Sequence, residues 1–386
     1  MNNQNQTDRL SELRSRIDEI DGELLKLFLE RMDISSAVAD YKRSTGMAVL
    51  DPVREKQVLK DKTDRLSDKS RENEVYEFFS SIMSISRDRQ NRELHRRNAR
   101  RIEDMLKPKA HVDDPVVAYF GTEGSYSEEA AIEYFGEDTK RFNAKNFEDA
   151  FLSLKDDKAD YAVLPIENSY TGTISDVIDL LADYNYYIVG EAAIPIRHCL
   201  LGLPGASIGD IKNIYSHEQG IMQSMDFLKT LKDVEWDTYF NTARSAKMVA
   251  ESGDKTKAAI ASRRSARLYG LDILAEDINN SVKNTTRFIV VSKAPELDKD
   301  CDKISAAFTL PHESGELHRV LACFARGGLN LLKIESRPLP DRNFEYKFFV
   351  DYVGNLLDEN VRRITNGVIE GTSEFELLGN YKAAVK

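Results

Sequence analysis

The sequence predicts a multidomain chain: an all-α helical domain, then an α/β domain, then a small α+β domain of the ferredoxin-like type. A chain of 386 residues is too long for one ordinary domain. Its pattern also changes twice, from helical with almost no Gly or Pro, to short β-rich runs between helices, to a short set of alternating strands and helices. We therefore place the domains at 1–95, 115–296 and 300–386, with a charged linker at 96–114.

The first domain begins with a long amphipathic helix. Its apolar residues recur with three-four alternation, a register typical of a helix packed against other helices. They are Leu10, Leu13, Ile17, Ile20, Leu24, Leu27, Ile34, Val38 and Tyr41. At ~1.5 Å per residue this helix would run roughly 48 Å, too long for a compact monomer of this domain. We therefore expect an intertwined dimer.

Polar residues interrupt the apolar faces of this domain. Arg31 occupies one position of the apolar register, where an arginine is costly unless its charge is paired. One alternative is a structural ion pair with a nearby glutamate. The third helix, however, continues its own apolar face at residues 75–82 as Ser86 and Gln90. Several polar positions of this kind favour a polar pocket inside a helical bundle.

In these positions the chain resembles the all-helical chorismate mutase family. The residues that carry the resemblance, in order and spacing, are Arg14, Arg31, Lys42, Asp51, Arg54, Glu55, Ser86 and Gln90. The family implies an intertwined homodimer in which each pocket borrows Arg14 from the partner chain. It also implies the substrate chorismate, a dicarboxylate that rearranges within itself, so no nucleophile, metal or cofactor is required.

Each residue of that set has an expected role. Arg14 and Arg31 would clamp the two carboxylates, because guanidinium groups bind carboxylates as bidentate forks. Lys42 and Gln90 would donate hydrogen bonds to the breaking ether oxygen. Glu55 would accept from the ring hydroxyl. The supporting residues would be Asp51, Arg54 and Ser86.

In the middle domain, short β-rich runs alternate with helical stretches, which predicts α/β units around a mostly parallel sheet. The expected strands end in small polar loops that lead into helices. These loops are residues 121–127, 167–173 and 216–220, with Gln223 one turn beyond the last. Such loops at the ends of parallel strands are where α/β proteins bind anions, although each alone could be an ordinary turn. None contains a Walker or dinucleotide-binding fingerprint, so nucleotide binding is not expected. His198 and His217 could equally be hydrogen-bonded structural residues.

Together these loops resemble the prephenate dehydratase family. The matching runs are G-T-E-G-S-Y-S at 121–127, P-I-E-N-S at 165–169, A-A-I-A-S at 258–262 and T-R-F at 286–288. The family implies two α/β lobes with a cleft between them, like a type II periplasmic binding protein. The functional positions it implies are Glu167, Asn168, Ser216, Gln223 and the essential Thr286.

Prephenate becomes aromatic phenylpyruvate when it loses carbon dioxide and its ring hydroxyl. The enzyme must orient the dicarboxylate and donate a hydrogen bond to the departing oxygen. Either Glu167 as a neutral acid or the Thr286 hydroxyl could be that donor, and the sequence leaves the choice open. Arg287 could clamp a carboxylate or buttress the loop.

The last domain has the order strand, helix, strand, strand, helix, strand, without a catalytic constellation. It resembles the ACT regulatory domain of these dehydratases through Glu335-Ser336-Arg337-Pro338 and the helix start at Gly315 and Leu317. The implied effector is L-phenylalanine. The implied effector-binding residues are Gly315, Glu316, Leu317, His318, Asn330, Glu335, Ser336 and Arg337.

Composition restricts the cellular context. With 54 Lys+Arg against 65 Asp+Glu, the net charge of -11 argues against nucleic-acid or anionic-membrane partners. Cys199, Cys301 and Cys323 lie far apart without metal-ligand spacing, which fits the reducing cytoplasm. The N-terminus has no signal-peptide core and no apolar run could span a membrane. We expect a cytoplasmic homodimer, which could pair into tetramers.

Two rival functions are disfavoured by missing motifs. A mutase fused to a prephenate dehydrogenase would need a dinucleotide-binding glycine fingerprint after the first domain. A ligand sensor without catalysis would be expected to carry a DNA-reading helix-turn-helix or a signal peptide. The sequence therefore favours a bifunctional enzyme of phenylalanine biosynthesis that acts on chorismate and then on prephenate.

Overall fold

The structure is a computed structural model, and it describes residues 2–45, 47, 51–95, 101–281, 283–339 and 345–384. The chain divides into two compact units. The first comprises Met1–Arg101 with Asn366–Ser373, and the second comprises Ile102–Thr365 with Glu374–Lys386. This division falls inside the expected linker, whose first five residues, 96–100, lie outside the described residues.

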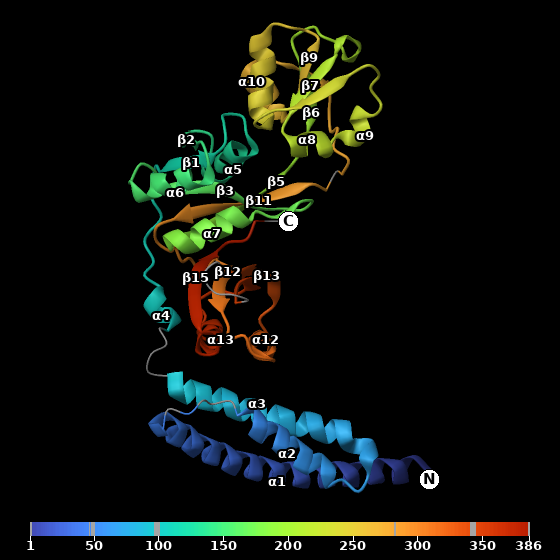
Figure 1. The fold of residues 1–386 in the computed structure, drawn as a ribbon, viewed down its shortest axis with the longest axis vertical. Helices are drawn as coiled ribbons and strands as arrows, with labels where there is room; N and C mark the ends of the chain where they lie inside the picture. Colours follow the sequence, from blue (N-terminus) through green and yellow to red (C-terminus); the bar gives the residue numbers. More distant parts are fainter. Residues whose placement is uncertain are drawn as a thin grey trace. The chain divides into compact units, whose positions relative to one another are not determined.

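The first unit contains the expected helices (Figure 1). They are α1 (Asn2–Thr45), α2 (Pro52–Asp64) and α3 (Glu72–His95), with a short 3-10 turn, η1 (Lys69–Arg71), before α3. Both α1 and α2 pack against α3. Met32 and Ala39 of α1 and Met83 of α3 are buried, whereas the apolar register of α1 that carries Leu10 to Tyr41 is 40–64% exposed. The bundle within one chain therefore leaves most of that apolar face uncovered.

The rest of the expected linker belongs to the second unit. It contains a short helix, α4 (Ile102–Met105), whose Ile102 is fully buried. The Lys109 N–H donates to the Pro295 carbonyl at 2.9 Å, and the Val112 N–H donates to the Tyr161 hydroxyl at 3.1 Å. Residues 109–112 are thus docked against the α/β domain, and Glu103 of α4 lies 3.8 Å from Arg362 of the C-terminal domain.

The first lobe of the α/β domain is a six-stranded sheet in the order β2-β1-β3-β11-β5, with β4 paired to β3 (Figure 1). Its strands are β1 (Val116–Phe120), β2 (Lys140–Ala144), β3 (Tyr161–Asn168), β4 (Gly172–Thr173), β5 (Tyr187–Pro195) and β11 (Thr285–Ser292). Its helices are α5 (Tyr126–Phe135), α6 (Phe147–Lys155) and α7 (Ser175–Tyr184).

The second lobe is a five-stranded sheet in the order β10-β6-β9-β7-β8. Its strands are β6 (Cys199–Gly202), β7 (Asn213–Ser216), β8 (Glu235–Thr238), β9 (Lys257–Ala261) and β10 (Asp272–Ala275). Its helices are η2 (Ile208–Asp210), α8 (Glu218–Met222), α9 (Met225–Leu228), α10 (Thr242–Ser252) and α11 (Arg263–Tyr269). The chain enters this lobe after β5 and returns to the first lobe in β11.

The sheets are mixed, which corrects the expectation of mostly parallel sheets. Strands β1, β2 and β3 pair in parallel, as do β7, β8 and β9. Strand β11 pairs antiparallel to both β3 and β5, and β6 pairs antiparallel to both β9 and β10. The antiparallel strands lie where the chain passes between lobes, so their direction follows from the crossing and not from a βαβ unit.

The C-terminal domain confirms the expected element order. Its elements are β12 (Lys303–Thr309), α12 (Glu316–Gly327), β13 (Leu331–Pro338), β14 (Tyr346–Val353), α13 (Glu359–Glu370) and β15 (Glu374–Tyr381). The strands form one sheet in the order β13-β14-β12-β15. Phe349, Leu378 and Tyr381 belong to the same buried cluster as Ile188 and Ile289 of the first lobe. These two domains therefore share a core.

In the described part of the chain, the helices are all too short or too polar to cross a membrane. Nor do the described residues include a group of three or more His, Cys, Asp or Glu side chains that could hold a metal ion.

Candidate active sites

The side chain of Arg31 extends from α1 toward α3 in the helical unit. Its guanidinium group donates to the Ser86 hydroxyl and, at 3.4 Å, to the Ile82 carbonyl. Within the described residues of this unit no carboxylate lies within ion-pair distance of it, so the alternative of a structural Arg–Glu pair is not supported. Burial lowers the pKa of Arg31, yet guanidinium groups remain charged in proteins. The site thus presents a partly buried positive charge without an anion.

The polar positions predicted on α3 do face α1. Gln90 donates from Nε2 to the Ser35 hydroxyl at 2.9 Å, and Ser35, Ser86 and Gln90 are all buried. Gln90 Oε1 has no hydrogen-bond partner in the described chain. A buried amide oxygen without a partner is costly, and such groups are concentrated at binding sites. The structure therefore brings Arg31, Ser86 and Gln90 together.

The residues predicted at the start of α2 have structural partners. Asp51 caps the helix, because its Oδ1 accepts from the Arg54 N–H at 2.9 Å. The Glu55 carboxylate is paired with Arg87 of α3, a residue that sequence reasoning did not single out. The Arg54 side chain is exposed, and Lys42 is half-buried near the end of α1.

Arg14 is not near this cluster within one chain. It lies on the same helix as Arg31 but 17 positions earlier, a separation of roughly 26 Å along the axis at ~1.5 Å per residue. Its side chain is exposed, among the uncovered apolar residues of α1. One copy of the chain therefore cannot bring both arginines to one small substrate.

The second unit contains a cleft of about 390 Å³ between its two lobes. Residues of all three predicted loops line it, among them Gly121, Asn168 and His217, together with Gln223 and Thr286. None of its described lining residues is a lysine or an arginine. Aromatic side chains supply much of the remaining wall: Phe120, Tyr126, Phe147, Phe240 and Phe288.

Thr286 enters the cleft from β11, beside Asn168 of β3. The two residues are cross-strand partners in the sheet, and Asn168 Nδ2 donates to Thr286 Oγ1 at 2.8 Å. Both side chains are buried. The threonine oxygen accepts this bond, and its own proton has no acceptor in the described chain. That proton is therefore left for a ligand.

Behind Asn168 the cleft wall is a network of buried polar side chains. Asn284 accepts from Asn168 at 2.8 Å and donates to Gln223 at 3.0 Å. His198 Nε2 also contacts Gln223 Oε1, at 3.1 Å. Burial lowers the pKa of His198 to about 4, while the Gln223 bond acts in the opposite direction. The ring is therefore neutral near pH 7.

Glu167 and Arg287 lie on the opposite face of the sheet from Asn168 and Thr286. Neither lines the cleft, because adjacent residues of a strand point to opposite faces. Arg287 pairs with Glu167 at 2.9 Å and with Asp351 of the C-terminal domain at 2.8 Å. This geometry disfavours two of the alternatives that the sequence left open: Glu167 is not placed to protonate a substrate in the cleft, and Arg287 is not placed to clamp one.

Arg287 is instead the centre of a charge cluster between the two domains. The cluster contains three cations, Arg287, Lys303 and Lys333, and four carboxylates, Glu167, Glu191, Glu335 and Asp351. Although burial opposes its charged form, nearby Asp351 and Glu191 raise the pKa of Arg287 above its usual value. The alternative that Arg287 buttresses the loop is the one that fits.

Ser216 supports the cleft from beneath. Its hydroxyl is fully buried and donates to the Ile260 carbonyl at 2.8 Å. A Cβ atom on Gly220 would lie 2.6 Å from Ser216 Oγ, so this glycine lets α8 approach the strand closely. Ser216 therefore acts on the site through the position of the 216–220 loop.

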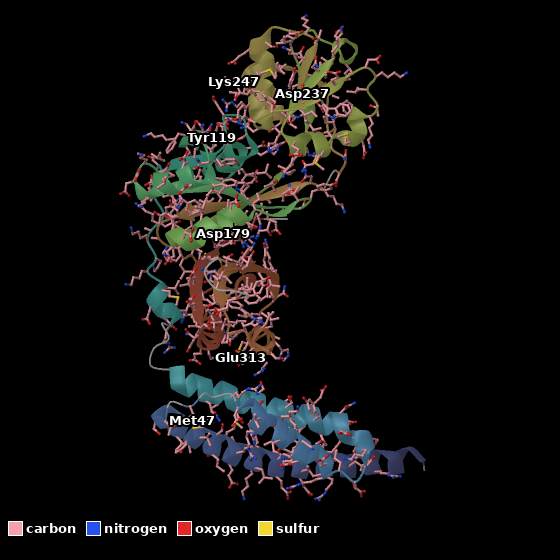
Figure 2. The ribbon with its side chains drawn as sticks, in the orientation of Figure 1. Met47, Tyr119, Asp179, Asp237, Lys247 and Glu313 are labelled. Carbon is pink, nitrogen blue, oxygen red and sulfur yellow. The ribbon has the colours of Figure 1, made fainter. Side chains whose placement is uncertain are left out.

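The predicted effector residues are divided between two faces of the C-terminal sheet. Arg337 contacts Asp179 of α7 at 2.8 Å, and Glu335 bonds to Thr173, so both face the dehydratase lobe (Figure 2 labels Asp179). Ser336 is on the opposite face and exposed. Gly315 begins α12 with a φ of 90°, a conformation that favours glycine.

The other predicted effector residues lie near the ends of α12. Glu316 pairs with Arg319 inside the helix, and Leu317 is half-buried. His318 and Asn330 are exposed. Within one chain these residues do not converge with Glu335 and Arg337.

Two family models match the chain: chorismate mutase type II over residues 13–91 and prephenate dehydratase over residues 117–296. The chain is 33% identical to a bifunctional chorismate mutase/prephenate dehydratase of Neisseria gonorrhoeae over 374 residues, 96% of each protein. It is similar to the crystal structure of a prephenate dehydratase from Arthrobacter aurescens in complex with L-Phe, with 31% identity and a TM-score of 0.64, covering 69% of this chain and 89% of that one. A structure of GqqA, described as a quorum-quenching acylase, matches with 29% identity and a TM-score of 0.65, covering 70% and 98%.

Proposed function

The chain belongs to the family of bifunctional chorismate mutase/prephenate dehydratases, and from that premise we propose which of its residues carry each reaction. It is an enzyme of L-phenylalanine biosynthesis. It rearranges chorismate to prephenate, and it converts prephenate to phenylpyruvate with loss of carbon dioxide and the ring hydroxyl. The mutase lies in the helical unit and the dehydratase in the α/β domain.

In the mutase, Arg31 binds one carboxylate of chorismate. The observation that carries this assignment is the partly buried guanidinium group with no carboxylate beside it in the described residues of the unit. An uncompensated cation of this kind is costly in the free protein and is offset when an anion binds. A bidentate contact would also hold the flexible substrate in its compact reactive conformer.

The second carboxylate is bound by Arg14 of the partner subunit. In one chain Arg14 is too far along α1 to reach the Arg31 pocket. The uncovered apolar register around Arg14 supports a second copy as the occupant of this face, because burying it stabilises the pair. The functional mutase is then an intertwined homodimer.

The remaining mutase residues complete the pocket. Lys42 and Gln90 donate to the ether oxygen on which charge develops. Glu55 accepts from the ring hydroxyl and is held in place by Arg87. Ser86 orients Arg31 through its hydroxyl, and Asp51 fixes the start of α2, from which the exposed Arg54 projects.

In the dehydratase, Thr286 donates a hydrogen bond to the departing ring hydroxyl. The supporting observation is that Asn168 donates to the threonine oxygen, which leaves the threonine proton for the substrate. As the carboxylate is lost, its bonding electrons enter the ring, the C–O bond breaks, and the hydrogen bond stabilises the hydroxide that leaves. Glu167, the other candidate, faces away from the cleft.

The carboxylates of prephenate are held without a cationic side chain from the cleft wall. Helices α5 and α10 begin at the cleft from opposite lobes, and Ser125, Ser127, Asn241 and Thr242 line it. Free N–H groups at helix N-termini favour anions. Gln223, whose amide N–H groups have no acceptor in the described chain, adds a further donor, and Ser216 fixes the adjacent loop.

The C-terminal domain is an ACT domain of ferredoxin-like fold that binds L-phenylalanine and inhibits the dehydratase. Its sheet order and its shared core with the first lobe support a route from effector to cleft. The likeness to a dehydratase crystallised with L-Phe favours this effector. The effector residues would be completed by a second C-terminal domain, in dimers that pair into tetramers, because one chain divides them between two faces.

We place the enzyme in the cytoplasm. All three cysteines are free, and Cys199 and Cys301 are buried, as in a reducing compartment. The type II periplasmic-binding-protein likeness of the two lobes then concerns the fold and not the location.

The test is a coupled assay on the purified full-length protein. Chorismate consumption and phenylpyruvate formation are followed with and without NAD, at rising L-phenylalanine. We expect both activities, no requirement for NAD, and inhibition of phenylpyruvate formation with coupling of about 1–3 kcal/mol. A chain that consumes chorismate but forms phenylpyruvate at no measurable rate would contradict the dehydratase assignment.

A further inference from the structure

The hydrogen bonds behind the cleft have a fixed direction, which is set at Asn168. Its Oδ1 atom accepts from the backbone N–H groups of Tyr170 at 2.9 Å and Thr171 at 3.0 Å. A backbone N–H can only donate, so the amide cannot be turned around, and Nδ2 must be the donor. That nitrogen donates to Thr286 Oγ1 and to Asn284 Oδ1, both at 2.8 Å.

The same reasoning assigns donor and acceptor at each hydrogen bond as far as His198. Since Asn284 Oδ1 accepts, its Nδ2 is the atom that donates to Gln223 Oε1, at 3.0 Å. An amide oxygen can only accept, so His198 Nε2, at 3.1 Å from it, must carry a proton. His198 Nδ1 faces the Tyr126 hydroxyl at 3.2 Å. The structure therefore specifies the tautomer of His198.

This series of hydrogen bonds leaves two side chains with N–H or O–H groups that can donate into the cleft. Gln223 Oε1 is held by His198 and Asn284, so its amide N–H groups, which have no acceptor in the described chain, are left for a ligand. Thr286 is left in the same state by Asn168. The described cleft lining offers no lysine or arginine, so neutral donors in a fixed orientation must contact the oxygens of the substrate.

His198 is suited to a fixed role because it does not titrate near neutral pH. His198 is only 2% exposed. Its ring contacts Gln223 and Tyr126, its backbone N–H donates to the Asn279 side chain, and all three partners are uncharged. Burial lowers the pKa of His198 to about 4. Both ring nitrogens face protein groups, so the ring does not exchange a proton with the substrate.

We propose that His198 is a positioning residue of the dehydratase, whose Nε2–H group orients the Gln223 amide toward prephenate and, through Asn284 and Asn168, supports the Thr286 hydroxyl. This inference deepens the proposed function and rests on the roles assigned there to Gln223 and Thr286. It assigns no step to the imidazole itself: the ring only holds the neighbouring donors.

The test compares His198→Gln with His198→Asn in the full-length enzyme. The amide nitrogen of glutamine can occupy the position of Nε2, whereas asparagine is one carbon shorter and reaches only the position of Nδ1. We expect His198→Asn to lower the dehydratase kcat/KM by roughly ten-fold or more, because the donors in the cleft lose their orientation. His198→Gln should remain within about threefold of the wild type.

Internal and matched controls separate positioning from folding. The mutase activity of the same preparations should not change, since its residues lie in the other unit. His111→Asn makes the same substitution at a histidine of this domain that contacts Glu296 and Tyr161 outside the cleft, and it should leave the dehydratase unchanged. Equal losses in His198→Gln and His198→Asn, or no loss in either, would overturn the proposal.

A double mutant tests the path. In a Gln223→Ala background, adding His198→Asn should cause little further loss, because the histidine then has no amide to orient. Multiplicative losses would overturn the proposal. Thr286→Ala is measured in parallel: if it retains full dehydratase activity, the role proposed for Thr286 fails, while the comparison of glutamine with asparagine at His198 still tests its action on Gln223.

Discussion

The helical unit and the cleft of the α/β domain differ in how much of a site one chain supplies. In the cleft, each donor that faces the ligand is held by a buried neighbour from the same chain, as Thr286 is held by Asn168. Among the described residues of the helical unit, Arg31 has one side-chain partner, Ser86, and its helix has an apolar face that is largely uncovered. With the roles proposed above, one chain completes the dehydratase site but supplies only part of the mutase site.

This difference has a physical origin in the secondary structure. Strands distant in sequence pair within one folded lobe. Residues such as Asn168 and Thr286 therefore meet within one domain. A straight helix separates its residues by ~1.5 Å each, so functional groups along α1 can meet only by pairing with another copy. The mutase rate should therefore depend on protein concentration and change when two variant chains are mixed, whereas the dehydratase rate per chain should not.

The largest expected effect is that of Arg31→Ala on the mutase. Removing the bidentate contact to a carboxylate should lower the rate of chorismate consumption on the order of hundreds-fold. The dehydratase activity of the same chain should remain, because its cleft lies in the other unit. Both rates are measured on one preparation, with circular dichroism to verify the helices.

The matched control for this variant is Arg16→Ala. Arg16 lies on the same helix, but it is exposed and pairs with Glu19, so its loss should leave chorismate consumption near the wild-type rate. If Arg31→Ala keeps its mutase rate within a few-fold, Arg31 is structural and the mutase site has been misplaced.

Next in size is the effect of Thr286 variants on the dehydratase. Thr286→Ala should lower phenylpyruvate formation by about a hundred-fold and let prephenate accumulate, because the departing hydroxyl loses its donor. Thr286→Ser keeps the hydroxyl and should retain part of the activity. The measurement follows prephenate and phenylpyruvate together after chorismate is added.

Thr285→Ala is the neighbouring control, since Thr285 does not line the cleft. Equal losses in Thr286→Ala and Thr286→Ser would point to a packing role for the Thr286 side chain and against hydrogen-bond donation.

Much of the cleft could be predicted from the sequence, but not the direction of every side chain in it. The three loops converge as expected, and Asn168, Gln223 and Thr286 line one cavity. Glu167 was expected at the same site from the family resemblance, and Arg287 was expected either to clamp a carboxylate there or to buttress the loop. Strand alternation sends them to the other face, and a strand assignment that included residues 167 and 286 would have revealed this.

Other features depended on contacts that no local pattern encodes. The partner of Arg287, Asp351, lies 64 residues later in the C-terminal domain. The buried network through Asn284 and His198 also combines separate segments. In the helical unit, by contrast, the three-helix order and the polar interruptions of the apolar faces at Arg31 and Ser86 followed from periodicity. The pairing of Arg87 with Glu55 did not.

A smaller effect is expected when two inactive mutases are mixed. If the partner subunit contributes Arg14, a mixed dimer of Arg14→Ala and Arg31→Ala chains has one pocket with both arginines and one with neither. Random exchange makes about half of the dimers mixed, so roughly a quarter of the wild-type mutase activity should return. The mixture is measured after mild denaturation and refolding together.

Mutase activity can return only if the chains exchange partners. The dehydratase activity of the same mixture shows how much of the protein has refolded, since each chain carries a whole cleft. No recovery, in mixtures shown to contain mixed dimers, would mean that Arg14 of the partner subunit does not complete the Arg31 pocket.

The smallest expected change in either rate comes from Asp351→Asn. This variant tests whether the charge cluster stabilises the packing of the C-terminal domain on the dehydratase lobe. Burial opposes ionisation of Asp351, but Arg287 and Lys303 outweigh it and hold the pKa of Asp351 below its usual range. Removing this charge leaves Lys303 with Glu191 as its remaining ion-pair partner in the described chain, and leaves Arg287 with Glu167 and Glu191.

We expect Asp351→Asn to lower the free energy of unfolding by about 3 kcal/mol at pH 7, seen as a melting temperature several degrees lower, with rates within about twofold. A carboxyl group with a depressed pKa stabilises the fold above its unfolded pKa of about 3.9, and that contribution is lost as the pH falls through the folded value. The difference between wild type and variant should therefore be full at pH 7 and narrow below about pH 4. Glu376→Gln is the matched control, because the ion pair of Glu376 in the described chain is with Lys347 of the same sheet. A deficit in Asp351→Asn no larger than that of Glu376→Gln would mean that the two domains are joined by their shared apolar core alone, with Ile188 and Leu378 on its two sides.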